Sequence, residues 1–237
     1  MLILFWVCAA LIGYVYFGYP LLLATGLLGR PREIHRAASE PLVSFIVAAH
    51  NEESAIADKL RNVLASDFPR RQMEVLIGSD GSSDRTEEIV RKFRADGVGL
   101  ISFPQQQGKS AMQNRLVAAA SGEVLVFTDA DSLLAPDSLG LLLENFADPG
   151  VGIVTSHPRY LNGTATAVAE NESLYFRYEG WLRERESAQG LLAMASGPLF
   201  AMRRPLWRPL DPNLGDDFVL PLRAAEAGFR NILDRRV

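Results

Sequence analysis

The stretch that most constrains the fold is residues 124–131, VLVFTDAD, where a short apolar run ends in two carboxylates separated by one small residue. The run is apolar on both faces and is bounded by Gly122 and Pro136, which favours a buried parallel strand. Alternate side chains of an extended chain point the same way, so Asp129 and Asp131 can converge on one point beyond the carboxyl end of the strand. In open α/β sheets, ligands bind at that edge.

The chemistry of this acidic pair favours a hard divalent cation. Two carboxylates suit Mg²⁺ or Mn²⁺, whose coordination is usually completed by water and substrate phosphates. An Asp-x-Asp pair is also common in solvated turns. The pair therefore predicts a metal site only in combination with other features of the chain.

The amino end predicts a membrane anchor. Residues 1–29 contain no charged side chain, and at about 1.5 Å per residue a helix of that length exceeds the roughly 30 Å hydrocarbon core. A buried core helix is the alternative. Arg30, Arg32 and Arg36 follow at once, so by the positive-inside rule the rest of the chain faces the cytoplasm. We expect a single-pass anchor in the cell inner membrane, joined by a basic linker over residues 30–40.

From Pro41 onward, apolar runs alternate with helical periodicity. We predict strands over residues 42–49, 75–77, 98–103, 123–128 and 151–156, and an extended segment over 192–202. We predict helices over residues 56–64, 110–120, 136–146, 164–189 and 216–227, with a further helix opened by a capping pair of Asp84 and Glu87. Strands alternating with helices of about a dozen residues predict βαβ units, a parallel sheet and right-handed crossovers.

Several binding functions are excluded by what the sequence lacks. No Gly-x-Gly-x-x-Gly follows the first predicted strand, so a dinucleotide fold would lack its phosphate turn. The GKS sequence at residues 108–110 imitates the end of a P-loop, but Phe103 stands where that motif requires glycine. A net charge of −4 argues against nucleic-acid binding.

Acids and amides instead follow successive predicted strands. They are Asn51 and Glu52 in AHNEE, Asp80 in SDGSSDRT, Lys109 and Asn114 after Gly108, and Asp129 with Asp131 in DAD. These motifs, in this order, strongly resemble family 2 glycosyltransferases of the GT-A fold. The resemblance covers Pro41 to the end of the chain. It implies an α/β domain with a mostly parallel sheet flanked by helices, in which residues 41–132 form a nucleotide-sugar-binding half and residues 133–237 an acceptor-side half.

The resemblance also implies roles for individual residues in an inverting, metal-dependent transferase that uses a nucleotide-diphosphate sugar, with a UDP-sugar expected. Asn51, Glu52 and Asp80 would contact the nucleoside, Lys109 would lie near the donor, Asp129 would touch ribose or metal, and Asp131 would bind Mg²⁺ or Mn²⁺. A helix cap is an equal alternative for Asn51 and Glu52. An Asp-Gly turn is the alternative for Asp80, and a solvated helix-start lysine is the alternative for Lys109.

On the acceptor side, GDDFVL at residues 215–220 is similar to the acid-Asp motif of the family. That similarity makes Asp217 the general base and Asp216 its neighbour. The alternative is that both acids only stabilise the start of a helix, where negative charge interacts favourably with the helix dipole. Ser196 and Gly197 resemble the segment that lies under the acceptor, where small residues let a sugar approach the backbone.

Two departures from the family pattern leave the nucleotide open: Ser79 stands where many members carry an acid, and His50 where many carry tyrosine. Membrane-embedded, processive members also carry a Gln-x-x-Arg-Trp motif further on, usually followed by more membrane helices. That motif does not occur before Val237. We therefore expect either a fragment or a simpler enzyme.

The leading hypothesis is a membrane-anchored glycosyltransferase that acts on a polysaccharide or lipid-linked acceptor. Transfer to polyprenyl phosphate is a second hypothesis, and a catalytically silent subunit that binds nucleotide or glycan within a synthase complex is a third. A nucleotidyltransferase would require a glycine-rich, basic loop after the first strand, where this chain has HNEE. The sequence specifies neither the donor sugar nor the oligomeric state.

Overall fold

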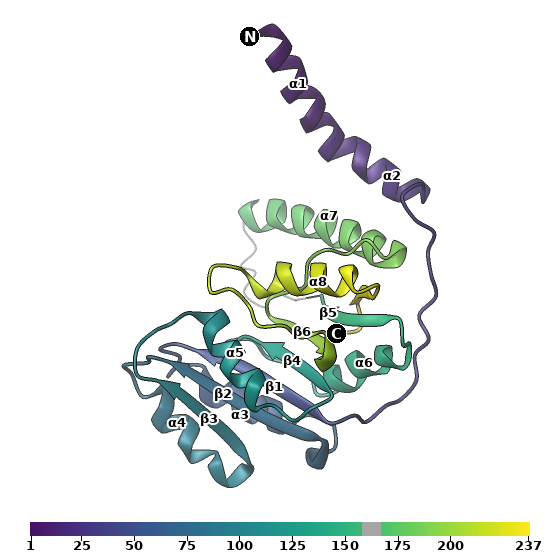
Figure 1. Cartoon of the computed structure of the whole chain (residues 1–237). Coiled ribbons are helices and arrows are strands. Elements are labelled where there is room, and N and C mark those ends of the chain that lie inside the picture. Colours follow the sequence, from purple (N-terminus) through teal and green to yellow (C-terminus); the bar gives the residue numbers. More distant parts are fainter. Residues whose placement is uncertain (158–166) are drawn as a thin grey trace. The chain divides into compact units, whose positions relative to one another are not determined.

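The computed structural model describes residues 1–157 and 167–237, with side chains described for residues 1–157 and 175–237 (Figure 1). The chain divides into two compact units. One contains α1 (Leu2–Gly13), η1 (Tyr14–Gly18), α2 (Tyr19–Thr25) and α7 (Ala167–Gln189). The other contains the sheet and the remaining helices.

The second unit is built on one seven-stranded sheet. Its strands are β1 (Val43–Ala49), β2 (Met73–Asp80), β3 (Val98–Phe103), β4 (Val124–Thr128), β5 (Val151–Ser156), β6 (Leu199–Arg203) and β7 (Arg230–Asp234), in the order β3-β2-β1-β4-β6-β5-β7. All neighbours pair in parallel except β6, which is antiparallel to both β4 and β5. The carboxyl ends of β1, β2 and β4 therefore meet at one edge of the sheet.

The antiparallel strand brings a distant segment to that same edge. Thr128, the last residue of β4, is paired with Leu199, the first residue of β6. Because β6 runs in the opposite direction, the residues before Leu199 lie where β4 ends. The sheet thus places Ser196 and Gly197 at the edge predicted for the acidic pair.

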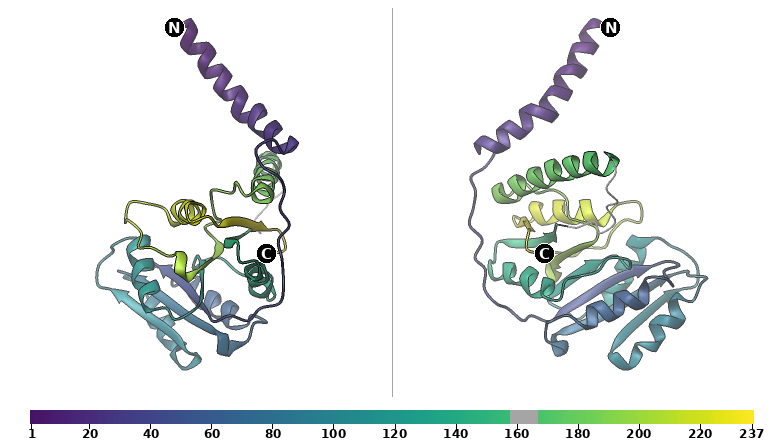
Figure 2. Two further views of the ribbon diagram at one scale, coloured as in Figure 1. Left: turned by 45° about the vertical axis from the view of Figure 1, so that its right-hand side comes forward. Right: turned by 180° about the vertical axis from the view of Figure 1, so that it is seen from behind.

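Helices cover both faces of the sheet (Figure 2). They are α3 (Ile56–Leu64), α4 (Thr86–Lys92), α5 (Lys109–Ala119), α6 (Ser138–Glu144) and α8 (Asp216–Glu226). Apolar side chains of α3, α4 and α6 share one core with Phe45 and Val47 of β1. Those of α5 and α8 share a second core with Ile46. Successive side chains of β1 therefore pack into the two cores on opposite faces of the sheet, because side chains alternate in direction along a strand.

Most predicted elements are confirmed within one or two residues, but the predicted capping pair is wrong. Asp84 does not pair with Glu87 in a capping box, because its carboxylate accepts hydrogen bonds from the backbone and hydroxyl of Thr86, while Glu87 pairs with Arg91 at 2.5 Å. The extended segment 192–202 forms a strand only from Leu199. Residues 164–166 of the long predicted helix lie outside the described residues.

The amino-terminal helix matches the predicted anchor in length and composition. Among the described residues, one helix, Leu2–Thr25, is long and apolar enough to cross a bilayer, and no residue of its most apolar window is buried. Its last turns pack within their own unit against α7. The Tyr19 hydroxyl donates to Glu186 Oε1 at 2.6 Å, and Gln189 Nε2 donates to the Leu23 carbonyl at 2.7 Å. Gly26 ends the helix in the left-handed conformation.

Candidate active site

The acidic pair follows β4 directly, at the predicted edge of the sheet. Lys109 Nζ lies 2.9 Å from Asp129 Oδ1. A Cβ atom added to Gly197 would lie 3.8 Å from Asp129 Oδ2. Asp129 therefore stands between the start of α5 and the segment that precedes β6, which are far apart in the sequence.

Further acids share this region. Burial raises the pKa of Glu52, and the carboxylates of Asp131, Asp84 and Asp129 raise it further. Electrostatic coupling of this kind requires the groups to be near one another. The ends of β1 and β4 therefore contribute to one negatively charged region, which favours a cationic ligand.

Asn51 and Glu52 join the loop after β1 to the loop after β2. Asn51 adopts a φ of 56°, a left-handed conformation that asparagine tolerates better than most residues. Its Oδ1 accepts a hydrogen bond from the Ser83 backbone at 2.8 Å, and the Glu52 backbone donates to Thr86 Oγ1 at 2.8 Å. The helix α3 begins later and has no side-chain cap. The predicted nucleoside contacts of both residues stay predictions.

Asp80 has a definite structural partner. Its side chain is 4% exposed. Oδ1 accepts a hydrogen bond from the Gln107 backbone at 2.7 Å, and Oδ2 accepts one from the Gly108 backbone at 2.8 Å. Asp80 thus fixes the loop that immediately precedes Lys109. Its predicted contact with the base stays a prediction.

Lys109 links the edge of β4 to the start of α8. Its Nζ atom lies 3.8 Å from Asp216 Oδ2, and Asp216, 6% exposed, also accepts a hydrogen bond from Gln113 Nε2 at 2.6 Å. Burial alone lowers the pKa of Lys109, but Asp216 and Asp129 outweigh it, with a smaller contribution from Asp217, so the pKa is raised. Lys109 therefore stays protonated, and its ammonium lies between Asp129, which follows β4, and Asp216 at the start of α8.

The small-residue segment before β6 is fixed from two sides. The Ser196 backbone donates to Thr155 Oγ1 at 2.6 Å, at the end of β5. The Ala195 backbone donates to the Asp217 carbonyl at 2.8 Å. The segment 195–197 therefore lies next to Asp129 through Gly197 and next to the start of α8 through Ala195, which brings residues predicted for the donor side and for the acceptor side close together.

The sequence prediction missed Lys59, which lies beneath the acidic pair. Its side chain is fully buried, and Nζ donates to Thr128 Oγ1 at 2.6 Å and to the Ser132 carbonyl at 2.7 Å. Burial lowers the pKa of Lys59 to about 7, while Asp129 and Asp131 act in the opposite direction. A signal was available, because Lys59 interrupts the apolar face of its helix.

The oxygen donors present fit a divalent cation that binds together with its substrate. Asp129 is partly exposed and Asp131 is exposed, so both carboxylates are accessible. In the described part of the chain, no group of three or more His, Cys, Asp or Glu side chains is placed to hold a metal ion. A site with two carboxylates that is completed by substrate phosphates agrees with both observations.

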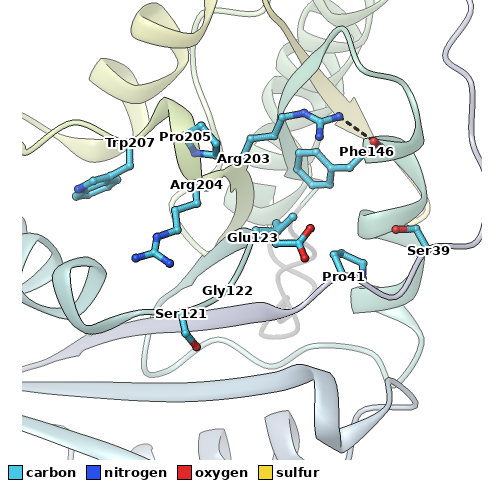
Figure 3. Close-up of a pocket in the computed structure, with 11 residues that line it drawn as sticks. Ser39, Pro41, Ser121, Gly122, Glu123, Phe146, Arg203, Arg204, Pro205 and Trp207 are labelled. Atoms are coloured by element: carbon cyan, nitrogen blue, oxygen red, sulfur yellow. Dashed lines mark hydrogen bonds between the residues drawn. The ribbon is translucent and has the colours of Figure 1, made fainter.

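A pocket of about 750 Å³ lies elsewhere, at the opposite edge of the sheet (Figure 3). It is lined by Val124 at the start of β4 and by Arg203 at the end of β6. The Arg203 guanidinium donates to three backbone carbonyls, including that of Phe146 at 2.8 Å. The five residues of β4, about 17 Å, separate this pocket from the carboxylates. It is therefore not part of the candidate active site.

Comparison with known proteins identifies the family of the chain. The family model described as glycosyl transferase family 2 matches residues 44–208. The poly-beta-1,6-N-acetyl-D-glucosamine synthases of Staphylococcus aureus (strain COL) and Staphylococcus epidermidis are each 29% identical over 157 residues, which is 65% of this chain and 38% of each relative. The chain thus spans less than half the length of these curated relatives.

Two solved structures are similar in fold. The mannosyltransferase PcManGT from Pyrobaculum calidifontis, in complex with GDP-Man and Mn²⁺, superposes with a TM-score of 0.77 at 28% identity, covering 96% of this chain and 65% of that chain. S. aureus TarS 1-349 in complex with UDP-GlcNAc superposes with a TM-score of 0.63 at 19% identity, covering 82% of this chain and 56% of that chain. The predicted GT-A fold is confirmed. Because the family model matches well over half of the sequence, the chain belongs to glycosyl transferase family 2.

Proposed function

We propose that this chain transfers a sugar, with inversion, from a nucleotide-diphosphate sugar to a polysaccharide or lipid-linked acceptor. One observation carries the proposal: Lys109 contacts Asp129 after β4 and lies near Asp216 at the start of α8, so that predicted donor and acceptor residues share one edge of the sheet. The S. aureus and S. epidermidis relatives are synthases of a GlcNAc polymer, and the similar solved structures carry GDP-Man or UDP-GlcNAc. A UDP-sugar is the first donor to test.

The donor side of the site suits a diphosphate. Asn51 and Glu52 follow β1 and Asp80 ends β2, at the edge of the sheet that would receive the nucleoside, while Asp129 and Asp131 would hold Mg²⁺ or Mn²⁺. When bound, such a cation supplies positive charge that stabilises the leaving diphosphate. Lys109 adds a second, permanent positive charge, since its pKa is raised. A preorganised cation of this kind stabilises charge that develops in the transition state.

The acceptor side supplies the base. In this proposal Asp217 takes the proton of the acceptor hydroxyl as its oxygen attacks the anomeric carbon. The bond from that carbon to the diphosphate oxygen breaks on the opposite face, and its electron pair leaves with the nucleoside diphosphate. Ser196 is buried and Gly197 is partly exposed, so in this proposal the acceptor sugar lies against the backbone at Gly197.

The proposal includes a membrane anchor at the amino end. The Leu2–Thr25 helix has the length and apolar character of a span, and the basic residues Arg30, Arg32 and Arg36 follow it. This charge asymmetry favours a cytoplasmic catalytic domain anchored in the cell inner membrane. An anchored enzyme would meet a growing glycan or lipid-linked acceptor at the membrane surface.

The test is donor turnover by the full chain in detergent or lipid nanodiscs. UDP-GlcNAc, GDP-Man and other nucleotide sugars are supplied with Mn²⁺, with Mg²⁺ or with EDTA, and the released nucleoside diphosphate is measured. We expect metal-dependent release from one donor, lost on addition of EDTA. The absence of both nucleotide release and nucleotide binding, with every donor tested, would overturn the proposal and favour the silent subunit.

A further inference from the structure

Lys59 is a buried lysine for which the proposed reaction has no direct use. It lies on α3 with 0% of its side chain exposed, among the apolar residues Ile56, Leu60 and Val63 of the same helix face. A lysine is almost never fully buried unless its ammonium is paired. Burial of an unpaired charge is strongly unfavourable. The position of Lys59 therefore has to be explained by its partners.

Those partners bracket the acidic pair. Nζ donates to Thr128 Oγ1 at 2.6 Å and to the Ser132 carbonyl at 2.7 Å. Thr128 immediately precedes Asp129, and Ser132 immediately follows Asp131. One ammonium group thus joins the two ends of the five-residue segment that carries both proposed metal ligands.

The network continues to the acceptor side. The Thr128 hydroxyl lies 2.8 Å from the Pro198 carbonyl and donates to it. A hydroxyl has one proton, so Thr128 must accept from Lys59 if it donates to Pro198. The hydrogen bonds therefore run in one direction, from Lys59 through Thr128 to Pro198. It connects α3, the acidic segment and the small-residue segment before β6.

We propose that Lys59 is a positioning residue that sets the acidic segment Asp129–Asp131 against the acceptor-side segment Ser196–Pro198. The functional part of this inference rests on the proposed transfer reaction. The structural part, that both segments are held by one buried ammonium, does not. A displacement of about 1 Å between reacting groups is enough to lower turnover by 10²-fold, so a fixed spacing between the two segments matters for transfer.

Two variants remove the network without removing volume. Lys59→Met keeps an unbranched side chain of similar length but has no amine. Because the two hydrogen-bond partners of Lys59 are uncharged, the substitution leaves no charge buried without a partner. Thr128→Val keeps the branched shape and loses the hydroxyl. Leu60→Met is the matched control, because Leu60 is equally buried on the same helix and has no part in the network.

Hydrogen exchange tests the structural part without any substrate. In the full chain, Lys59→Met and Thr128→Val are expected to accelerate amide exchange at least tenfold in residues 129–134 and in residues 195–199 together. Leu60→Met should leave both segments unchanged. Unchanged exchange in Lys59→Met, or acceleration spread evenly over the domain, would overturn the proposal even if no donor is ever turned over.

Kinetics test the functional part once a donor is known. Lys59→Met and Thr128→Val should each lower kcat at least tenfold, with the donor KM changed less than threefold. Because both act through one network, the double variant should be no worse than Lys59→Met alone. Multiplicative losses in the double variant, or parental kcat in Lys59→Met, would refute a positioning role, whereas an inactive parent chain would refute the proposed function instead.

Discussion

The ammonium of Lys109 lies 2.9 Å from Asp129 Oδ1 and 3.8 Å from Asp216 Oδ2, and so connects two acids that are 87 residues apart in the sequence (216 − 129). The first follows a strand and the second begins a helix. Their shared contact with the Lys109 ammonium joins the carboxyl end of β4 to the start of α8 at one edge of the sheet.

Replacement of Lys109 by methionine should lower transfer by about 10²-fold, because it removes a preorganised positive charge next to the leaving diphosphate. The measurement is kcat and the donor KM of the purified full chain. Lys92→Met is the control, since Lys92 forms an exposed ion pair with Glu88 on α4. Equal activity of the two variants would remove Lys109 from the site.

Asp131→Asn should abolish transfer and weaken metal-dependent donor binding, because an amide is a poor replacement for an anionic oxygen ligand. Isothermal titration of the nucleoside diphosphate, with and without Mn²⁺, separates the two effects. We expect the Mn²⁺-dependent part of the affinity to disappear. Retention of that part would show that the cation is held by other groups.

Asp217→Asn should abolish transfer but leave donor binding intact, because the proposed base acts on the acceptor hydroxyl and not on the nucleotide. The same titration, performed on this variant, is the control. Near-normal turnover would remove the assignment of the base. A loss of nucleotide affinity equal to that of Asp131→Asn would place Asp217 on the donor side.

Gly197→Ala should impair acceptor binding, whereas Gly122→Ala should lower stability. Among the described residues, a Cβ on Gly197 meets only Asp129 Oδ2, at 3.8 Å, so the variant should keep its Tm but raise the acceptor KM. A Cβ on Gly122 would lie 2.5 Å from the Ser44 backbone nitrogen, so that variant should lose about 1–3 kcal/mol of stability. Thermal melts and acceptor titrations check both. A normal acceptor KM for Gly197→Ala would contradict the proposed acceptor position.

Acid should destabilise the sheet unit through Asp148. Burial alone raises the pKa of Asp148, but hydrogen bonds from the Gly150 backbone and the Arg230 guanidinium outweigh it, so the pKa is lowered. The stabilisation is therefore present above the unfolded pKa of about 3.9 and is lost as the pH falls through the lower folded value.

Asp148→Asn tests this acid dependence. It should lower the free energy of unfolding at pH 7 by about 1.5–3 kcal/mol, as expected for a hydrogen bond to a charged group, and flatten the acid limb of the stability curve. Denaturant titrations between pH 3 and pH 7 measure both. Asp58→Asn, in an exposed pair with Arg61, should change neither. A steep acid limb in Asp148→Asn would assign the effect to other carboxylates.

The local patterns of the sequence predicted the elements and the edge at which the site lies. Apolar runs such as residues 124–128 specify strands because side-chain periodicity is a property of adjacent residues. The carboxylates that follow the run must then lie at the end of the strand. The position of Asp129 and Asp131 needed no tertiary information.

The sequence did not predict the direction of β6 or the partners of buried polar groups. A strand of five residues reads the same in either direction, and only its insertion between β4 and β5 brings Gly197 to Asp129. Asp84 was expected to form a capping pair with Glu87, but its carboxylate instead accepts a hydrogen bond from the nearer backbone of Thr86.

The sequence by itself therefore determined which residues form strands and helices, and that acids follow the strands, because these depend on neighbours along the chain. The tertiary structure alone decided that Lys59 reaches Thr128, 69 residues away, and that Lys109 joins Asp129 to Asp216. Such contacts depend on the order and direction of strands in the sheet. That order is set by the packing of the whole domain and not by any local pattern.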